Sequence, residues 1–295
     1  MHSEPGGWLG AMRVEPGGRD HASPAMEPRS SGESATPPPG TSSRGLGPSA
    51  GATRPVYSVV ITVYNEEGNI DPVIEELYPA MARLGEPFEV VYCDDASDDR
   101  TAERLAAARR RHANLRVVRH RDNWGKSVAL WSAADAARGE WLIMLDGDGQ
   151  NDPADIPRLI EARGDPARRP RLAMVAGIRR RRRDSWLKRV SSRIANGVRG
   201  RVLKDQTPDT GCGLKLCRRD AFLRLPRFDH NHRFLPALIQ RDGGEVAFVE
   251  VSDRPRMSGR SKYGLRNRFL TGIVDLVGVY WLMRRAANPV IEYEE

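Results

Sequence analysis

The sequence lacks any long apolar segment and is poor in cysteine. No run of about 18 or more apolar residues occurs, and no basic segment precedes an apolar core of the kind found in signal peptides. The three cysteines, Cys93, Cys212 and Cys217, form no closely spaced CxxC pair, and their odd number leaves at least one unpaired. These absences argue against a disulfide scaffold, a zinc motif and a spanning helix. They indicate a cytoplasmic chain with reduced thiols that is either soluble or membrane-peripheral.

Acidic residues are fewer than basic ones. The 295 residues include 47 Lys and Arg against 39 Asp and Glu, a formal net charge of +8. Residues 1–54 hold five charges of each sign, so the whole excess lies beyond residue 54. Such a field attracts an anionic partner, and nucleic acid, anionic lipid and phosphorylated substrates all remain open at this point.

Residues 1–54 also lack apolar periodicity. They are rich in Pro, Gly and Ser and include PPPG at 37–40. Because such a segment cannot bury enough apolar surface to offset the entropy of ordering, we expect a disordered tail. The remainder is long enough for a large domain with its own core.

Apolar strands and helices alternate from Tyr57 onward. We expect strands at 57–63, 88–93, 115–120, 141–145, 172–177 and 246–251. We expect one helix that begins at Asp71, a second that ends at about Arg111, and three more at 127–137, 185–202 and 232–241. The alternation predicts an α/β fold with a mostly parallel, Rossmann-like sheet flanked by helices. Trp124 and Trp131 are expected in the core, and His230 and His232 as surface or packing residues.

Three of the first four strands end in acidic clusters. VYNEE closes the first, DDASDD follows the second and DGDGQNDP follows the fourth. Because ligands of parallel sheets bind beyond the carboxyl ends of the strands, these clusters indicate a ligand site at that edge.

Asp146 and Asp148 stand at a spacing of two, with Gly147 and Gly149 allowing a tight turn. Both carboxylates can therefore converge on one hard cation that keeps positions open for phosphate oxygens. This geometry suits a metal that holds a nucleoside diphosphate. A plain surface turn remains the alternative, because Asp and Gly favour turns for conformational reasons.

Together with RPRMSGRSKYG at 254–264, these motifs resemble the family-2 glycosyltransferases with the GT-A fold. Among them the chain is most similar to the dolichyl-phosphate mannosyltransferase-like group, which charges polyprenyl phosphates, and the resemblance runs from about Tyr57 to Arg285. It implies a GT-A domain at 55–264 and a C-terminal segment at 265–295.

The resemblance implies three sets of site residues. The residues for catalysis and for the metal, Mg²⁺ or Mn²⁺, are Asp146, Asp148 and Gln150. The residues for the nucleotide sugar are Tyr64, Glu66, Asp95, Asp146, Arg256 and Lys262. The residues for the acceptor phosphate are Arg179, Arg193 and Asp209. From the residues alone, Asp209 could instead shape a turn in TPDTGCG.

The implied reaction is inverting, metal-dependent transfer of a sugar from a GDP- or UDP-sugar to undecaprenyl or dolichyl phosphate. A phosphate monoester is already anionic at neutral pH and needs no strong general base, which agrees with the lack of an obvious catalytic histidine. One alternative is a family-2 enzyme with a sugar or protein acceptor, which would need a base near Asp209. Another is a basic nucleic-acid-binding protein built around the arginine run at 179–183, although aromatic residues do not interleave with it.

The C-terminal segment predicts an amphipathic helix from Arg266 to Arg285. Its apolar positions are 269, 270, 273, 274, 276, 277, 280 and 281. Tyr280 and Trp281, with arginines at both ends, suit the interface of an anionic membrane, so we expect peripheral binding at the cytoplasmic face. A helix packed on the core is the alternative that the same periodicity allows.

Overall fold

A computed structural model describes residues 54–179, 197, 199–203, 205, 207–256 and 265–285, the last range with side chains at 272 and 274–285. The expected tail at 1–54 and helix at 185–202 lie almost wholly outside these residues. The strands are β1 (Tyr57–Val63), β2 (Phe88–Asp94), β3 (Leu115–Arg119), β4 (Trp141–Asp146), β5 (Leu172–Arg179), β6 (Lys215–Arg218) and β7 (Glu245–Val251). They form one seven-stranded sheet in the order β3-β2-β1-β4-β6-β5-β7.

The sheet is mostly parallel, as the alternating pattern predicts. Strands β1, β2, β3 and β4 run in one direction, and β5 pairs parallel with β7. Strand β6 is inserted antiparallel to both β4 and β5. Strand β5 therefore runs in the same direction as β4, so both end at one edge of the sheet. Strand β6 is not predicted by the sequence pattern.

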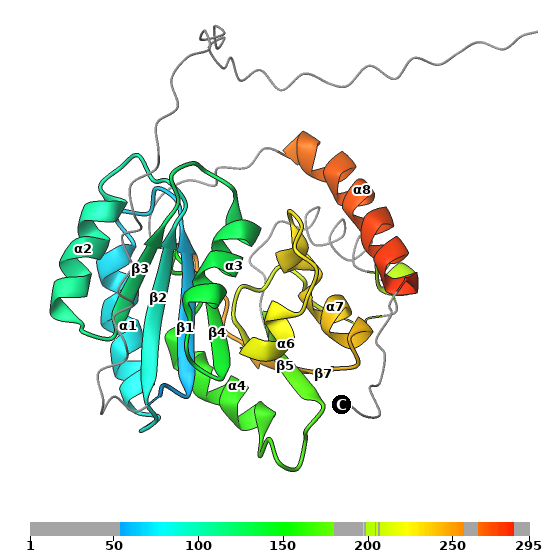
Figure 1. Ribbon diagram of the computed structural model, residues 1–295, viewed down its shortest axis with the longest axis horizontal. Coiled ribbons are helices and arrows are strands. Elements are labelled where there is room, and N and C mark those ends of the chain that lie inside the picture. Colours follow the sequence, from blue (N-terminus) through cyan, green and yellow to red (C-terminus); the bar gives the residue numbers. More distant parts are fainter. Residues whose placement is uncertain are drawn as a thin grey trace, which may run out of the picture. The chain divides into compact units, whose positions relative to one another are not determined.

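Helices cover both faces of this sheet (Figure 1). They are α1 (Ile70–Ala82), α2 (Thr101–Arg111), α3 (Lys126–Ala136), α4 (Ile156–Arg163), α6 (Arg219–Leu223), α7 (Leu235–Arg241) and α8 (Leu265–Arg284), with short 3₁₀ turns η1 (Pro153–Asp155) and η2 (Asn231–Arg233). Helices α1, α2 and α4 bury side chains in one core cluster. Helices α3, α6, α7 and α8 contribute to a second cluster on the opposite face.

Strand β1 shows how the sequence builds both clusters. Val59, Ile61 and Val63 enter the first cluster, whereas Val60 enters the second. Successive side chains of a strand point to opposite faces, so a strand covered by helices on both sides is apolar at nearly every position. This is why 57–63 reads as a continuous apolar run.

Helix α8 has one face in contact with the domain and one face exposed. Val279 is buried in the second cluster, where Leu276, Tyr280 and Met283 pack partly buried against it. The guanidinium of Arg241 on α7 donates to the carbonyl of Leu282 at 3.0 Å. Among the helices that the structure describes, none is long and apolar enough to cross a membrane.

Candidate active site

The loops that follow β1 and β2 are joined by reciprocal hydrogen bonds at the carboxyl edge of the sheet. The Asn65 amide donates to Asp98, and the Asp98 backbone N–H donates back to Asn65 at 2.9 Å. The Glu66 N–H donates to the Thr101 hydroxyl at 2.8 Å. Asn65 holds a left-handed φ of 54°, which asparagine tolerates better than most residues. The two acidic motifs therefore form one cross-linked platform.

Asp95 organises the loop that precedes α3. Its carboxylate accepts hydrogen bonds from His120 Nδ1 at 2.7 Å and from the backbone N–H groups of Trp124 at 3.0 Å and Gly125 at 2.7 Å. The side chain is almost fully buried. These bonds use about three of the four lone-pair positions of the carboxylate, which leaves about one for a ligand. Asp95 thus fixes where α3 begins.

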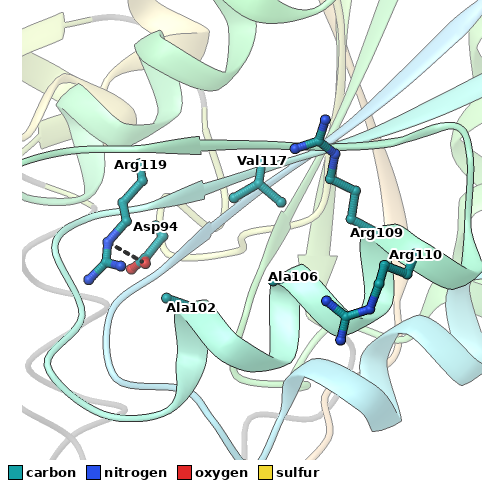
Figure 2. Close-up of a pocket in the computed structure, with 7 residues that line it drawn as sticks. All are labelled: Asp94, Ala102, Ala106, Arg109, Arg110, Val117 and Arg119. Atoms are coloured by element: carbon teal, nitrogen blue, oxygen red, sulfur yellow. Dashed lines mark ion pairs between the residues drawn. The ribbon is translucent and has the colours of Figure 1, made fainter.

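The neighbouring Asp94 lies on the other side of β2, beside a cavity of about 520 Å³ between α2 and β3 (Figure 2). The Arg119 guanidinium pairs with its carboxylate at 3.3 Å, and the Ser97 N–H donates to the same carboxylate at 3.0 Å. Arg109 and Arg110 also line this cavity. Asp94 therefore stabilises its own loop and does not join Asp95.

Asp146 is the last residue of β4 and Asp148 lies in the turn that follows, and each is paired with a cation. The Lys126 ammonium, at the first position of α3, pairs with Asp146. Burial raises the pKa of Asp146, but the charges of Lys126, Lys215 and Arg179 outweigh it and hold the pKa below its usual value. Burial and the charge of Asp146 raise the pKa of Asp148. The two carboxylates therefore sense each other's charge.

Two arginines after β7 hold the acidic turn in place. Arg256 donates to Glu66 Oε1 at 3.3 Å and pairs with Asp148 Oδ2 at 2.9 Å. Arg254 donates to the carbonyls of Gly149 at 3.2 Å and Asn151 at 3.0 Å. The segment after β7 is thus linked to the motifs after both β1 and β4.

The turn from Asp146 to Asn151 is held by close packing against Gly213 and by hydrogen bonds within the turn. A Cβ added to Gly213 would lie 2.5 Å from the Asp146 carboxylate, so any larger residue there would have to displace that carboxylate. The Asp146 N–H donates to Asn151 Oδ1 at 2.8 Å, and the Gln150 N–H donates to Asp148 Oδ1 at 3.0 Å. The Gln150 side chain points to the Arg254 carbonyl at 3.5 Å.

The carboxylates of Asp146 and Asp148 fit a divalent cation whose remaining coordination positions are filled by water and a bound ligand. Among the described residues, no three or more His, Cys, Asp or Glu side chains form a group that could hold a metal ion by themselves. Mg²⁺ usually takes one or two carboxylates and fills its remaining positions with water and substrate phosphates. The two neighbouring carboxylates provide hard oxygens, and a bound cation would relieve both the burial and the repulsion from Asp146 that raise the pKa of Asp148.

Arg179 and Asp209 form a bidentate ion pair at the end of β5. Arg179 Nε donates to Asp209 Oδ2 at 2.7 Å, and Nη2 donates to Oδ1 at 2.8 Å. The hydrogen bonds to Asp209 raise the pKa of Arg179, and its charge also helps to lower that of Asp146. Two predicted acceptor residues therefore lie beside the predicted metal turn, but they contact each other.

Two further side chains in this region are buried or partly buried, and the first of them, Lys215, was not predicted from the sequence. Lys215 on β6 is buried, donates to the Cys212 carbonyl and has a pKa lowered by desolvation. His232 hydrogen-bonds to the Ser127 hydroxyl at 2.7 Å, and burial lowers its pKa well below the usual value. His232 is thus a packing residue, one of the two roles expected for it.

Lys126 was not predicted from the sequence, and the prediction for Trp124 was wrong. Trp131 is buried as expected, but Trp124 is 63% exposed. Trp124 lies in the loop between β3 and α3, where Asp95 holds its backbone N–H and its side chain is in contact with solvent. The GK sequence at the start of α3 could have indicated a cation at the acidic edge. Lys262 and Arg193 lie outside the described residues.

Comparison with known proteins identifies the fold. The chain is similar to a mannosyltransferase from Pyrobaculum calidifontis, in complex with GDP-Man and Mn²⁺, with a TM-score of 0.58 and 22% identity over 80% of this chain and 66% of that one. It is also similar to glucosyl-3-phosphoglycerate synthase from Mycobacterium tuberculosis, in complex with Mn²⁺ and UDP among other ligands, with a TM-score of 0.57 and 19% identity over 79% and 81%. The architecture is the GT-A fold of glycosyltransferases.

Sequence comparison identifies the family. Residues 58–226 match glycosyl transferase family 2. The chain is 32% identical to dodecaprenyl-phosphate galacturonate synthase of Rhizobium johnstonii over 82% of its own length and 72% of that protein. It is 33% identical to undecaprenyl-phosphate 4-deoxy-4-formamido-L-arabinose transferase of Edwardsiella ictaluri and 35% to that of Pseudomonas paraeruginosa, over 75% of this chain and 66% and 64% of theirs. The chain belongs to family 2 of the glycosyltransferases, and it spans about two thirds of the length of several curated relatives.

Proposed function

We propose that this glycosyltransferase moves a sugar from a GDP- or UDP-sugar to a polyprenyl phosphate such as undecaprenyl or dolichyl phosphate, with inversion. The main observation is that Asp146 and Asp148 lie beside Lys126, Arg256 and Arg179 at one edge of the sheet. Two carboxylates among three cations suit a substrate pair that carries a diphosphate and a monophosphate. The names of the relatives support this choice of acceptor.

The donor subsite is assigned to the loops after β1, β2 and β4. Tyr64 is partly exposed at the edge and Asp95 has about one acceptor position left, so with Glu66 they would bind the base and ribose. Asp146 and Asp148, with Gln150 nearby, would hold Mg²⁺ or Mn²⁺. Such an ion stabilises the charge that develops on the departing diphosphate.

The chain's own residues provide positioning and charge. An oxygen of the acceptor phosphate forms a bond to the anomeric carbon as the bond from that carbon to the nucleoside diphosphate breaks, and the bonding electrons leave with the diphosphate. Arg256 and Lys126 would stabilise the leaving group, and Arg179 would orient the incoming phosphate. A single in-line displacement of this kind inverts the anomeric centre.

A sugar or protein acceptor is the second candidate, and it would need a base. Asp209 would have to supply it, but both of its oxygens accept hydrogen bonds from Arg179. A phosphate acceptor requires no such base. This difference favours the polyprenyl phosphate.

We also propose that α8 meets the membrane surface. Val274, Val277 and Trp281 are 70%, 63% and 59% exposed, and their spacing of three and four places them on one side of the helix. Arg284 and Arg285 are exposed at its C-terminal end. An apolar stripe next to basic charge suits an anionic bilayer, where a polyprenyl phosphate resides, and the site would then act at the cytoplasmic face.

The decisive experiment incubates the protein and Mn²⁺ with labelled GDP- and UDP-sugars and either undecaprenyl or dolichyl phosphate. Label should enter the organic phase with at least one donor. The matched control replaces the lipid phosphate with the corresponding free polyprenol, which lacks the attacking oxyanion. Equal transfer to the free alcohol would show that the acceptor assignment is wrong.

A further inference from the structure

Each carboxylate of the proposed metal pair already contacts a protein cation. Lys126 pairs with Asp146, and Arg256 pairs with Asp148 at 2.9 Å. Each of the two negative charges therefore has a protein cation beside it before any ligand binds, and Arg256 is shared with Glu66. A metal ion that approaches Asp146 must compete with an ammonium for the same carboxylate.

The position of Lys126 is set by the backbone. Gly125 adopts a φ of 85° immediately before α3, a conformation that suits glycine. The N–H groups of Trp124 and Gly125 are both held by Asp95, and the Asn123 amide donates to the Asp95 carbonyl at 3.0 Å. The start of α3 is thus fixed to the end of β2, which directs Lys126 towards the end of β4.

We propose that Lys126 is an internal counter-ion of Asp146, which a divalent metal displaces, and that its ammonium then pairs with the donor diphosphate. This inference rests on the proposed function. Its consequence is that metal and nucleoside diphosphate bind cooperatively. Lys126 would thereby keep Asp146 from binding a metal tightly until the donor arrives.

Charge balance explains the expected cooperativity. Metal alone would add two positive charges to a pair of carboxylates that protein cations already neutralise, and the released ammonium would have no new partner. Metal together with a diphosphate adds charges of both signs, and the diphosphate oxygens can accept the ammonium. Charges a few ångströms apart in a partly buried site interact strongly enough for this difference to control binding.

The test measures Mn²⁺ binding directly, by the electron paramagnetic resonance signal of free Mn²⁺, with and without UDP or GDP. The wild type should bind Mn²⁺ weakly alone and more tightly with nucleotide. Lys126→Met should bind Mn²⁺ alone at least about tenfold more tightly, because a competing charge is gone, and should gain less from nucleotide. Lys126→Arg keeps the charge and should resemble the wild type.

Arg168→Met is the matched control for net charge, because the Arg168 side chain is 87% exposed and forms an ion pair with Asp165, three residues away in the sequence. It should leave Mn²⁺ binding unchanged. Lys126→Gln, checked for a native melting transition, repeats the test with a polar side chain. If both neutral variants bind Mn²⁺ no more tightly than the wild type, the counter-ion role is wrong, although the proposed function stands as long as the wild type binds Mn²⁺ with nucleotide. A wild type that binds no Mn²⁺ with either nucleotide would overturn both.

Discussion

The two halves of the site are built in different ways. The donor half, after β1, β2 and β4, consists of short motifs whose backbone N–H groups and side chains bond to one another, as in the exchange between Asn65 and Asp98. The acceptor half depends on a reversed strand, β6, and on the Arg179–Asp209 pair, whose members are 30 residues apart in sequence. Hydrogen bonds between loops at the ends of parallel strands, several of them from backbone N–H groups, therefore form the donor half, whereas an inserted antiparallel strand and one side-chain ion pair form the acceptor half.

We therefore expect substitutions in the two halves to have different effects on activity and stability. Substitution of Asp146 or Asp148 should remove catalysis while the fold survives, because both carboxylates lie outside the two hydrophobic clusters. Substitution of Arg179 or Asp209 should alter substrate use and stability together, because this bidentate pair joins the end of β5 to the loop before β6.

The largest expected effect is in the donor half. Asp148→Ala should reduce transfer by about a thousandfold or more, because it removes a proposed ligand of the ion that stabilises the leaving group. Asp148→Asn should be nearly as damaging, and EDTA should abolish wild-type activity. The measurement is label transfer, with circular dichroism to show that the fold is intact. An active Asp148→Ala enzyme would contradict the metal assignment.

In the acceptor half, Arg179→Ala should raise the KM for polyprenyl phosphate by about 10- to 100-fold, because a charge-assisted contact is lost. Calorimetry with GDP and UDP should show unchanged donor binding. The melting temperature should also fall, because Asp209 is left buried without its guanidinium partner. Arg179→Lys keeps the charge but not the bidentate geometry, so its KM for polyprenyl phosphate should lie between the values for the wild type and for Arg179→Ala. Equal losses of donor and acceptor binding would place Arg179 in the donor half instead.

Helix α8 allows a similar comparison between its two faces. Val277→Glu with Trp281→Glu should abolish flotation with anionic vesicles and leave the protein folded, because both side chains are exposed. Leu276→Glu, on the packed face, should lower the melting temperature. If the exposed-face variant floats like the wild type, α8 does not bind the membrane.

The smallest expected effect concerns the reciprocal hydrogen bonds between Asn65 and Asp98, which join the loops after β1 and β2. Asn65→Ala should lower the free energy of unfolding by about 1–2 kcal/mol, because alanine disfavours a positive φ and the reciprocal hydrogen bonds are lost. Asn65→Gly relieves only the backbone strain and should recover part of that loss in urea titrations. If the two variants are equally stable, strain does not contribute.

Much of the fold was predictable because its signals are local. Apolar runs and acidic turns predicted six of the seven strands to within a few residues and the edge at which the motifs gather. Strand β6 was missed because Lys215–Arg218 is short and contains two basic residues. Trp124 was misplaced because a large aromatic residue just before a helix resembles a core residue, and its exposure depends on how Asp95 and Gly125 set the loop before α3.

The sequence by itself determined the mostly parallel α/β fold, the family and the identity of the acidic motifs, because each depends on residues close together in the chain. Only the tertiary structure decided which charges meet: Lys126 with Asp146, Arg256 with both Glu66 and Asp148, and Arg179 with Asp209. It also decided which face of α8 packs and which is exposed. The reason is that ion pairing and burial depend on distances between elements, which the linear pattern of residues does not contain.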